Sequence, residues 1–413
     1  MSKGNRTYWK GIEQLKNDPS FVKNAQNEFA EFLPIKGSSD NSRRDFLKMM
    51  GFGIAAASVA ACEAPVKKAI PYVNKPIDID PSIPNYYAST YSMGSDYCSV
   101  VVKTREGRPI KIDGNKFSKV SGGTTTSQVE SSVLTLYDKQ RLKGPKLNNK
   151  ESNWNDVDNF VSERLDSSNK NYIISNSICS PSTLDVIDQF SKKYNATHVM
   201  YDSKSYHGML EANQMQFNKR KLPSYDFSKS KIIVSFGYDF LGSSFNHNLF
   251  NRQFAQTRKV NSNKREMSRL YSFESNLSLT GANADHRIPI KSSLSPIYIS
   301  ELYNLLLNKL NKSSSPKINI DDSKLNLIKS DILNQVADDL IKNIGESIVI
   351  SDSNDQYVQL VVNMINAILE NYGKTIDINK CYNLRKGSDS DMVNFVKDLK
   401  NKNVNSVIFL NSN

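Results

Sequence analysis

Lys231-Ile232-Ile233-Val234-Ser235-Phe236 is a strand-length, mainly apolar run in the middle of this 413-residue chain. Such a run is typical of a strand that is covered on both faces of its sheet. Similar runs occur at residues 172–174, 198–201, 266–273, 347–350 and 406–410. Amphipathic stretches such as 183–194 and 357–372 lie between them. The alternation predicts βαβ units over residues 151–413, in an α/β fold with a doubly wound, mostly parallel sheet.

The chain stops at Asn413, directly after the run at 406–410. In open α/β sheets the functional loops follow the carboxyl ends of the strands, and here that loop is missing. We therefore expect the α/β domain to be incomplete at its carboxyl end.

A region of shorter strands precedes this domain, over residues 86–150. Polar and apolar residues alternate over residues 97–104, with Val100 and Val102 on the apolar face. Residues 106–109 have the composition of a turn, and residues 110–112 form the returning strand. This pattern predicts a β-hairpin. Five prolines between residues 63 and 85 exclude a helix or a central strand, because proline fixes φ and lacks an N–H donor. We expect residues 62–85 to form an extended tether.

An export signal is indicated over residues 42–61. Ser42-Arg43-Arg44-Asp45-Phe46-Leu47-Lys48 matches a twin-arginine signal at Arg43, Arg44, Phe46 and Leu47. The apolar run that follows, residues 49–61, would be roughly 20 Å long as a helix, and a bilayer core is about 30 Å thick. We interpret the run as the apolar part of a signal and not as a membrane span. The twin-arginine translocase is then a partner during export.

Val59-Ala60-Ala61-Cys62 has the pattern of a lipobox. Cys62 would receive a diacylglycerol and become the first residue of the mature protein. The alternative is an ordinary signal with a cysteine near its cleavage point. Two or more lipid tails give stable anchoring, so we expect a lipid-anchored protein on the periplasmic side of the cytoplasmic membrane.

Residues 1–41 form an extension that is too long for an ordinary signal. Apolar residues recur there at helical spacing, and Asn17-Asp18-Pro19-Ser20 separates two predicted short helices. The extension is either a linker or a cytoplasmic docking segment for a chaperone, since the twin-arginine route carries folded proteins.

Composition excludes several classes of protein. Hydrophobic residues make up 38% and charged residues 23%, as in folded globular proteins. The formal charge is +12, but the basic residues are scattered along the chain, so we expect no nucleic-acid partner. The four cysteines, Cys62, Cys98, Cys179 and Cys381, include no C-x-x-C pair and predict no zinc, iron-sulfur or disulfide framework.

Four segments, at residues 98–115, 136–145, 277–290 and 366–375, together resemble the molybdopterin oxidoreductase superfamily. The long export extension, the lipobox and Leu279-Thr280-Gly281-Ala282-Asn283-Ala284-Asp285 are most similar to the large iron-sulfur subunit of alternative complex III, a quinol-oxidising respiratory complex. The resemblance implies a molybdopterin-enzyme-like domain followed by a ferredoxin-like domain with iron-sulfur clusters. It implies that only the first domain is present, and that other subunits of a membrane respiratory complex are partners.

The chain departs from the catalytic members of this superfamily at their iron-sulfur site. Those members often carry C-x2-C-x3-C before the hairpin and a fourth cysteine further on. When Cys98 is aligned with the third cysteine of that motif, Tyr91 and Gly94 stand where the first two cysteines would be. The position of the fourth cysteine falls near residues 124–126, which are all threonine. One thiolate does not hold a four-iron cluster. We therefore expect no cofactor in this chain and expect Cys98 to be a small buried hydrophobe.

The other candidate ligands are weaker. Cys179-Ser180-Pro181-Ser182 follows an early strand, where the superfamily places a metal ligand, but a serine helix cap beside a core-packed Cys179 explains it better. No G-x-G-x-x-G loop is present to bind a pyrophosphate. The four histidines, His198, His207, His247 and His286, show no H-x-x-x-H or His-carboxylate spacing typical of a metal site. Residues 285–287 are predicted to form a turn before a strand at 288–290, where their charges pair locally or meet a partner subunit.

Two hypotheses of function remain. The first is a cofactor-free structural and interaction domain of a membrane electron-transfer complex, without catalytic residues. The second is a fragment of a catalytic molybdopterin-dependent oxidoreductase, with the cofactor held between lobes that residues outside this sequence complete.

Overall fold

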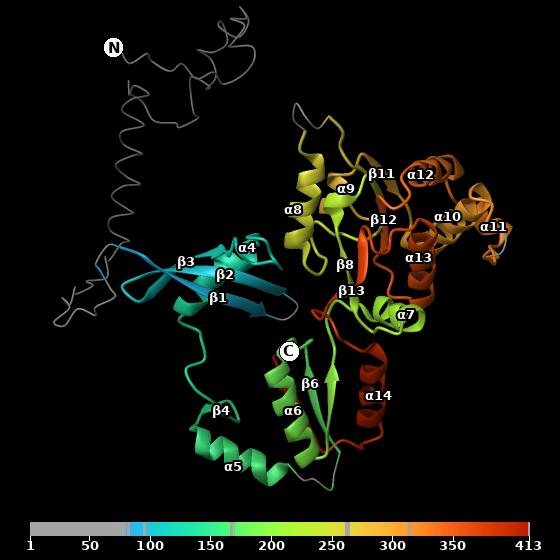
Figure 1. Ribbon diagram of the computed structural model, residues 1–413. Helices are drawn as coiled ribbons and strands as arrows, with labels where there is room; N and C mark the ends of the chain where they lie inside the picture. The colour runs from blue at the N-terminus through green and yellow to red at the C-terminus, as the bar shows by residue number, and fades with distance from the viewer. Residues whose placement is uncertain are drawn as a thin grey trace, which may run out of the picture. The chain divides into compact units, whose positions relative to one another are not determined.

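The computed structural model describes residue 80, residues 83–93, 96–165, 168, 170–260, 265–312 and 315–411. Two compact units divide the chain, Met1–Asn74 and Lys75–Asn413, and the described residues lie in the second. Figure 1 shows this unit coloured along the chain. The predicted export signal, the lipidation site Cys62, the extension over 1–41 and most of the tether lie outside the described residues.

A three-stranded antiparallel sheet opens the described chain. It consists of β1 (Asn85–Met93), β2 (Asp96–Arg105) and β3 (Arg108–Gly114), in the order β1-β2-β3. The predicted hairpin is confirmed as β2 and β3, and Glu106 and Gly107 turn the chain with φ of 50° and 75°. Helix α4 (Ser127–Ser131) and the 3-10 helix η2 (Ser132–Tyr137) follow, and they contribute Val129 and Val133 to a core shared with the sheet. We call residues 83–145 the β module.

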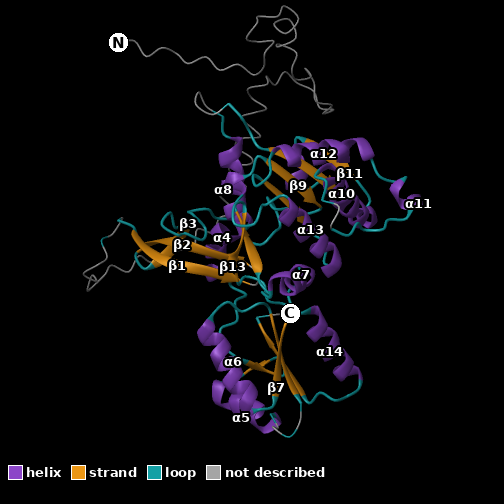
Figure 2. Ribbon diagram, turned by 45° about the vertical axis from the view of Figure 1, so that its right-hand side comes forward, coloured by secondary structure: helices purple, strands orange, loops and turns teal. Residues whose placement is uncertain are grey.

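The central part of the α/β region is a four-stranded parallel sheet in the order β11-β10-β9-β12. Its strands are β9 (Ile232–Phe236), β10 (Arg269–Glu274), β11 (His286–Pro289) and β12 (Ser347–Ser351). Alternate residues of β9 face opposite sides, and both sides are buried. Val234 packs into a cluster with α10 (Ser295–Lys309), α12 (Ser330–Lys342) and α13 (Gln356–Ile368), whereas Ile233 packs with α7 (His207–Phe217) and α8 (His247–Arg258). The prediction of strands covered on both faces is confirmed for this sheet (Figure 2).

A second parallel sheet, in the order β14-β6-β7, is separate from the first. It contains β6 (Asn171–Ser175), β7 (Ala196–Met200) and β14 (Ser406–Leu410), with α6 (Pro181–Lys193) and α14 (Asp389–Lys400) beside it. The α/β class is confirmed, but one doubly wound sheet was the wrong arrangement. Each of these strands contains a short apolar run in the sequence, so the runs located the strands without specifying which of them pair.

The remaining elements connect these layers. Strands β8 (Leu222–Tyr225) and β13 (Ile376–Tyr382) form an antiparallel pair. The others are β4 (Lys146–Leu147), β5 (Lys150–Glu151), α5 (Trp154–Arg164), η3 (Phe227–Lys229), α9 (Leu279–Ala282), η4 (Ser292–Leu294) and α11 (Asp322–Leu325). Within the described residues, no helix combines the length and the apolar character needed to span a bilayer.

Two predicted boundaries were wrong. The strand expected from residue 266 begins at Arg269, where parallel pairing with Ile232 starts. The turn expected over 285–287 is already strand from His286, because His286 pairs with Tyr271 of β10. In both cases the partner strand, and not the local sequence, decides where the ladder begins.

Candidate functional site

Three of the positions that were compared with the iron-sulfur ligands of molybdenum enzymes, Tyr91, Cys98 and Thr124, lie close together in the β module. Tyr91 lies opposite Cys98 in the antiparallel ladder, and the Cys98 Sγ donates to the carbonyl oxygen of Thr124 at 3.2 Å. Cys98 is fully buried, as expected, and burial raises the pKa of its thiol, although a hydrogen bond with Ser121 opposes this effect. Gly94 lies outside the described residues. One protonated thiol among hydroxyl and phenol groups does not fit a four-iron cluster, which requires four thiolates.

The loop around Cys179 is a helix cap. The Ser180 Oγ accepts a hydrogen bond from the Thr183 backbone N–H at 3.3 Å, so the predicted cap of α6 is confirmed. Cys179 was expected in the core but is exposed, and its Sγ donates to the Asn383 carbonyl oxygen at 3.2 Å. The physical reason is that residues 176–180 leave the sheet to reach the start of α6 at the surface.

The histidines are dispersed and serve local contacts. The His198 Nε2 lies 2.7 Å from the Ser175 Oγ, and the His247 Nδ1 lies 3.0 Å from the Ser244 carbonyl oxygen. His207 is one helical turn before Glu211, with Nδ1 3.7 Å from Oε1, a His-carboxylate spacing that the sequence analysis overlooked. Within the described part of the chain, no three His, Cys, Asp or Glu side chains are grouped so as to hold a metal ion.

Charged residues at both ends of β10 pair with their neighbours. Both terminal nitrogens of Arg258 donate to the Asp285 carboxylate, at 2.7 and 2.9 Å. Arg287 donates from Nε to the Glu274 Oε1 at 2.6 Å. Burial acts to raise the pKa of Asp285, but the Arg258 guanidinium and the Leu270 N–H outweigh it, and the pKa is lowered. The expected local pairing of charges at 285–287 is therefore present.

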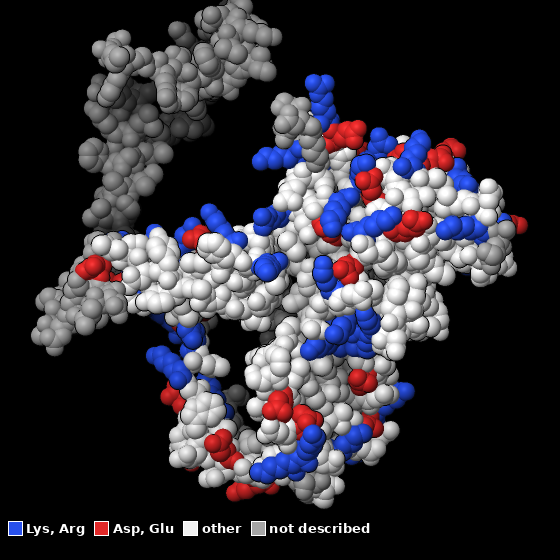
Figure 3. Space-filling model, in the orientation of Figure 1, with Lys and Arg blue, Asp and Glu red and all other residues white. Residues whose placement is uncertain are grey.

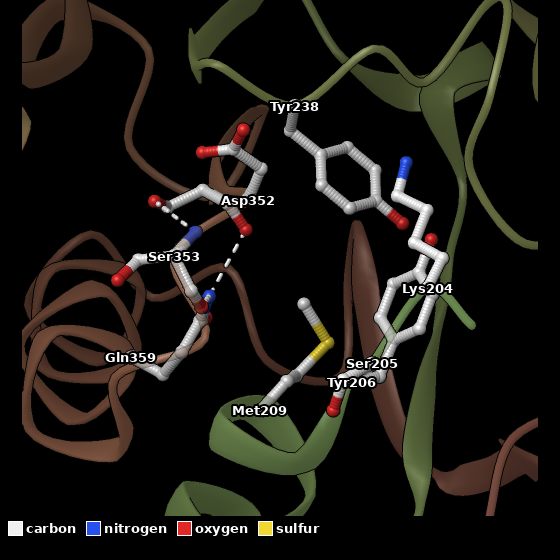
Figure 4. Close-up of a pocket in the computed structure, with 9 residues that line it drawn as sticks. Lys204, Ser205, Tyr206, Met209, Tyr238, Asp352, Ser353 and Gln359 are labelled. Atoms are coloured by element: carbon white, nitrogen blue, oxygen red, sulfur yellow. Dashed lines mark hydrogen bonds between the residues drawn. The ribbon is translucent and has the colours of Figure 1, made fainter. Parts of the chain in front are cut away.

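A pocket that the sequence analysis missed lies at the carboxyl ends of β9 and β12 (Figure 4). It is lined by Lys204, Ser205, Tyr206, Met209, Tyr238, Ser351, Asp352, Ser353 and Gln359. Its free volume is about 20 Å³, which is enough for a single water molecule. Asp352 directly follows the buried strand β12, and Tyr238 follows the buried strand β9 after one intervening residue, Gly237. That position is the signal that sequence reasoning had available, since ligands of parallel sheets bind beyond the strand ends.

Glycine is required at the edge of this pocket. Gly237 has φ of 72°, and a Cβ atom there would lie 2.5 Å from the Asp352 Oδ1. A side chain at position 237 would therefore displace the carboxylate as well as strain the backbone. The close approach holds the end of β9 against the end of β12.

The ionisable groups of the pocket are perturbed by burial. Partial burial lowers the pKa of the Lys204 ammonium group, which donates to the Ser243 carbonyl and hydroxyl oxygens at 2.8 and 3.0 Å. Partial burial raises the pKa of Asp352, an effect that the charge of Lys204 opposes. Burial also raises the pKa of Tyr238 well above the usual phenol value. The Tyr238 hydroxyl is thus a protonated group, and no described partner completes a well-formed hydrogen bond to it.

Hydrogen bonds tie together loops from the carboxyl ends of both parallel sheets. The Asp202 carboxylate, after β7, accepts from the N–H and hydroxyl of Ser177 at 2.9 and 2.6 Å. Asp389, at the start of α14, accepts from the Ser205 hydroxyl at 2.8 Å and from the Asn354 amide at 2.7 Å. The arrangement fixes these loops in place and surrounds a water-sized space with polar groups. Pockets that hold a cofactor enclose about 300 Å³ or more.

Fold and site thus define a mixed α/β protein with two parallel sheets and a small polar pocket where their loops meet. No family model and no curated protein matches the sequence. Among solved structures, the chain is similar to one in the formyltransferase/hydrolase complex from Methylorubrum extorquens in complex with methylofuran. The similarity has a TM-score of 0.36 and 8% sequence identity, and it covers 54% of this chain and 56% of that chain. The chain therefore spans little more than half of that neighbour.

Proposed function

We propose that this chain is a cofactor-free structural and interaction domain of a membrane-associated respiratory quinol:electron acceptor oxidoreductase of the alternative complex III type. In this proposal its fold is that of the molybdopterin oxidoreductases. It is exported by the twin-arginine route and held at the membrane through a lipid on Cys62. It positions a carboxy-terminal iron-sulfur domain against the other subunits.

The observation that carries this proposal is the environment of Cys98. Tyr91 lies opposite Cys98, and the buried Cys98 thiol donates to the Thr124 carbonyl oxygen, so these positions supply a single thiol. A single thiol in place of four supports a domain that does not bind a four-iron cluster.

The test is to isolate the protein from its native membrane with its associated subunits. We expect the other subunits to be recovered with it, and mass spectrometry to find a diacylglycerol on Cys62. Molybdenum analysis distinguishes the competing hypothesis, a fragment of a catalytic molybdopterin oxidoreductase. Stoichiometric molybdenum, or recovery of the chain without any subunit of a respiratory complex, contradicts the proposal.

Two variants separate export from anchoring. Arg43→Lys with Arg44→Lys should leave the protein in the cytoplasm, because the ammonium groups do not reproduce the geometry of paired guanidinium groups. Cys62→Ser should still be exported but should be released from the membrane or remain unprocessed. Normal export of the first variant, or normal anchoring of the second, contradicts the corresponding part of the proposal.

A further inference from the structure

The excess positive charge of the chain is concentrated in and around the β module. Residues 83–150 contain eleven Lys and Arg residues against five Asp and Glu residues, an excess of six. The formal charge of the whole chain is +12, so this short region carries half of it. The basic residues are scattered along the chain, but acidic residues balance them outside this region more than within it. On the face shown in Figure 3, blue side chains predominate along this region, whereas both colours mix over the described part of residues 151–411, which we call the α/β body.

The same region also exposes many large hydrophobic side chains. Of the twenty-six exposed large hydrophobic residues in the described chain, ten lie between Ile83 and Leu142. The densest group lies on η2 and just after it, where Leu134 is 68% and Leu142 is 74% exposed. Monomeric proteins rarely gather apolar side chains in this way without a partner.

This group is held in a defined position by contacts with the sheet. The Tyr137 hydroxyl donates to the Pro109 carbonyl oxygen of β3 at 2.6 Å, which attaches the end of η2 to the sheet. Val133 on the same 3-10 helix is buried in the module core. With about three residues per turn, Leu134 and Tyr137 lie on one side of the helix. Leu134 and Tyr137 are therefore presented by an element that is attached to the sheet.

Basic residues follow immediately along the chain. Lys139, Arg141 and Lys143 are all exposed, and the Arg141 guanidinium donates back to the Leu136 carbonyl oxygen at 3.5 Å. Asp138 is the one acidic residue between positions 134 and 143, and its carboxylate accepts from the Gln140 N–H at 2.8 Å. We call Leu134, Leu136, Tyr137, Lys139, Arg141, Leu142 and Lys143 the basic-apolar patch.

We propose that the basic-apolar patch binds the surface of a bilayer that contains anionic phospholipids. Leucine and tyrosine side chains enter the interface between headgroups and acyl chains, while lysine and arginine attract the phosphates. The proposal rests on the proposed function for one step, the lipid on Cys62. Residues 63–84 then reach at most about 75 Å from the membrane, so the β module is the first described region within reach of it.

The test measures the binding of unlipidated full-length protein to vesicles. Cys62→Ser protein is mixed with phosphatidylglycerol-containing vesicles or with pure phosphatidylcholine vesicles, and the bound fraction is measured by flotation. We expect tighter binding to the anionic vesicles and loss of that preference at high salt. In the same background, Lys139→Glu with Arg141→Glu and Lys143→Glu should weaken binding to anionic vesicles by about a hundredfold or more. Leu134→Ser with Leu142→Ser should weaken it by about tenfold.

A matched control changes net charge by the same amount on the α/β body. Lys259→Glu with Lys312→Glu and Lys317→Glu alters three other exposed lysines and should retain most of the binding. Circular dichroism of each variant checks that it is folded. Equal binding by the patch variant and the control overturns the proposal, as does equal binding of the parent protein to both kinds of vesicle. If the patch variant binds vesicles normally but no longer recovers the other subunits, the patch is a protein interface and the proposal is wrong.

The outcome is independent of the larger proposal. Vesicle binding uses protein without a lipid, so it succeeds or fails whatever mass spectrometry finds at Cys62. Conversely, if the protein is found lipidated and assembled but its unlipidated form does not bind vesicles, the proposed function stands and only the membrane-binding proposal is wrong.

Discussion

The β module and the α/β body use their apolar residues in opposite ways. The module has one core cluster of five buried residues, on one face of its sheet. The four-stranded sheet of the body is buried on both faces, against clusters of twenty-one and seventeen residues. A three-stranded sheet with so small a core is only marginally stable by itself. The comparison teaches that the body is the rigid part of this protein, and that the module leaves apolar and basic side chains available for contacts with other molecules.

The largest effect is expected from a cavity in the body. Phe236 is fully buried in β9, and its ring stacks on that of Phe273 with centroids 4.8 Å apart. Phe236→Ala should lower the free energy of unfolding by about 4 kcal/mol, measured by urea denaturation. Phe409→Ala makes the same chemical change at a ring that is 60% exposed in β14, and it should cost less than about 1 kcal/mol. Similar costs for the two variants would contradict the assignment of the rigid core to the four-stranded sheet.

A second test compares ion pairs in the two regions. In the body, Glu274 is 5% exposed and pairs with Arg287, so Arg287→Gln leaves a buried carboxylate without its cation. We expect a loss of about 3 kcal/mol in the free energy of unfolding. In the module, Lys111 and Asp113 form a pair with 59% and 44% exposure, and Lys111→Gln should leave the midpoint of urea denaturation nearly unchanged, because solvent screens the pair. A larger loss of stability for Lys111→Gln than for Arg287→Gln would contradict the comparison between the module and the body.

A third test examines the core of the module. Cys98→Ala removes a sulfur atom from a buried site and should lower the free energy of unfolding by about 1 kcal/mol. The variant should assemble normally and should show no change in iron content, because one buried thiol does not hold a four-iron cluster. Cys179→Ala is the matched control at an exposed cysteine, with an expected change below about 0.5 kcal/mol. Iron that is lost with the Cys98 sulfur would show that other groups near Thr124 bind metal with it.

The smallest effect concerns acid stability. The pKa of Asp285 is lower in the folded protein because Arg258 and a backbone N–H outweigh its burial. A carboxylate with a depressed pKa contributes its full stability above its unfolded value of about 3.9, and that stability is lost as the pH falls through the folded value. Asp285→Asn should thus destabilise the body at pH 7 by up to about 1 kcal/mol, since the pair is partly exposed. The difference from the parent protein should shrink in melting curves recorded near pH 3, and a difference that grows toward low pH would contradict this sign.

Much of the local structure followed from the sequence. The apolar runs located six strands of the two parallel sheets, the turn at 106–109 located the hairpin, and Ser180 marked the start of α6. These features depend on residues that are close together in the chain. Cys179 was misplaced because its exposure depends on the path of the loop to α6, and the length of β11 was misjudged because its partner, β10, sets its first residue.

Sequence by itself determined where most of the strands lie, that paired arginines and an apolar run precede Cys62, and that the four cysteines include no C-x-x-C pair. Each of these is a property of neighbouring residues or of composition. Only the tertiary structure decided that β14 pairs with β6 in a separate sheet, that Cys98 meets the Thr124 carbonyl, and that Lys204, Tyr238 and Asp352 line one pocket. Those contacts join residues that are distant in the chain, and similar apolar runs do not specify which strands will be neighbours.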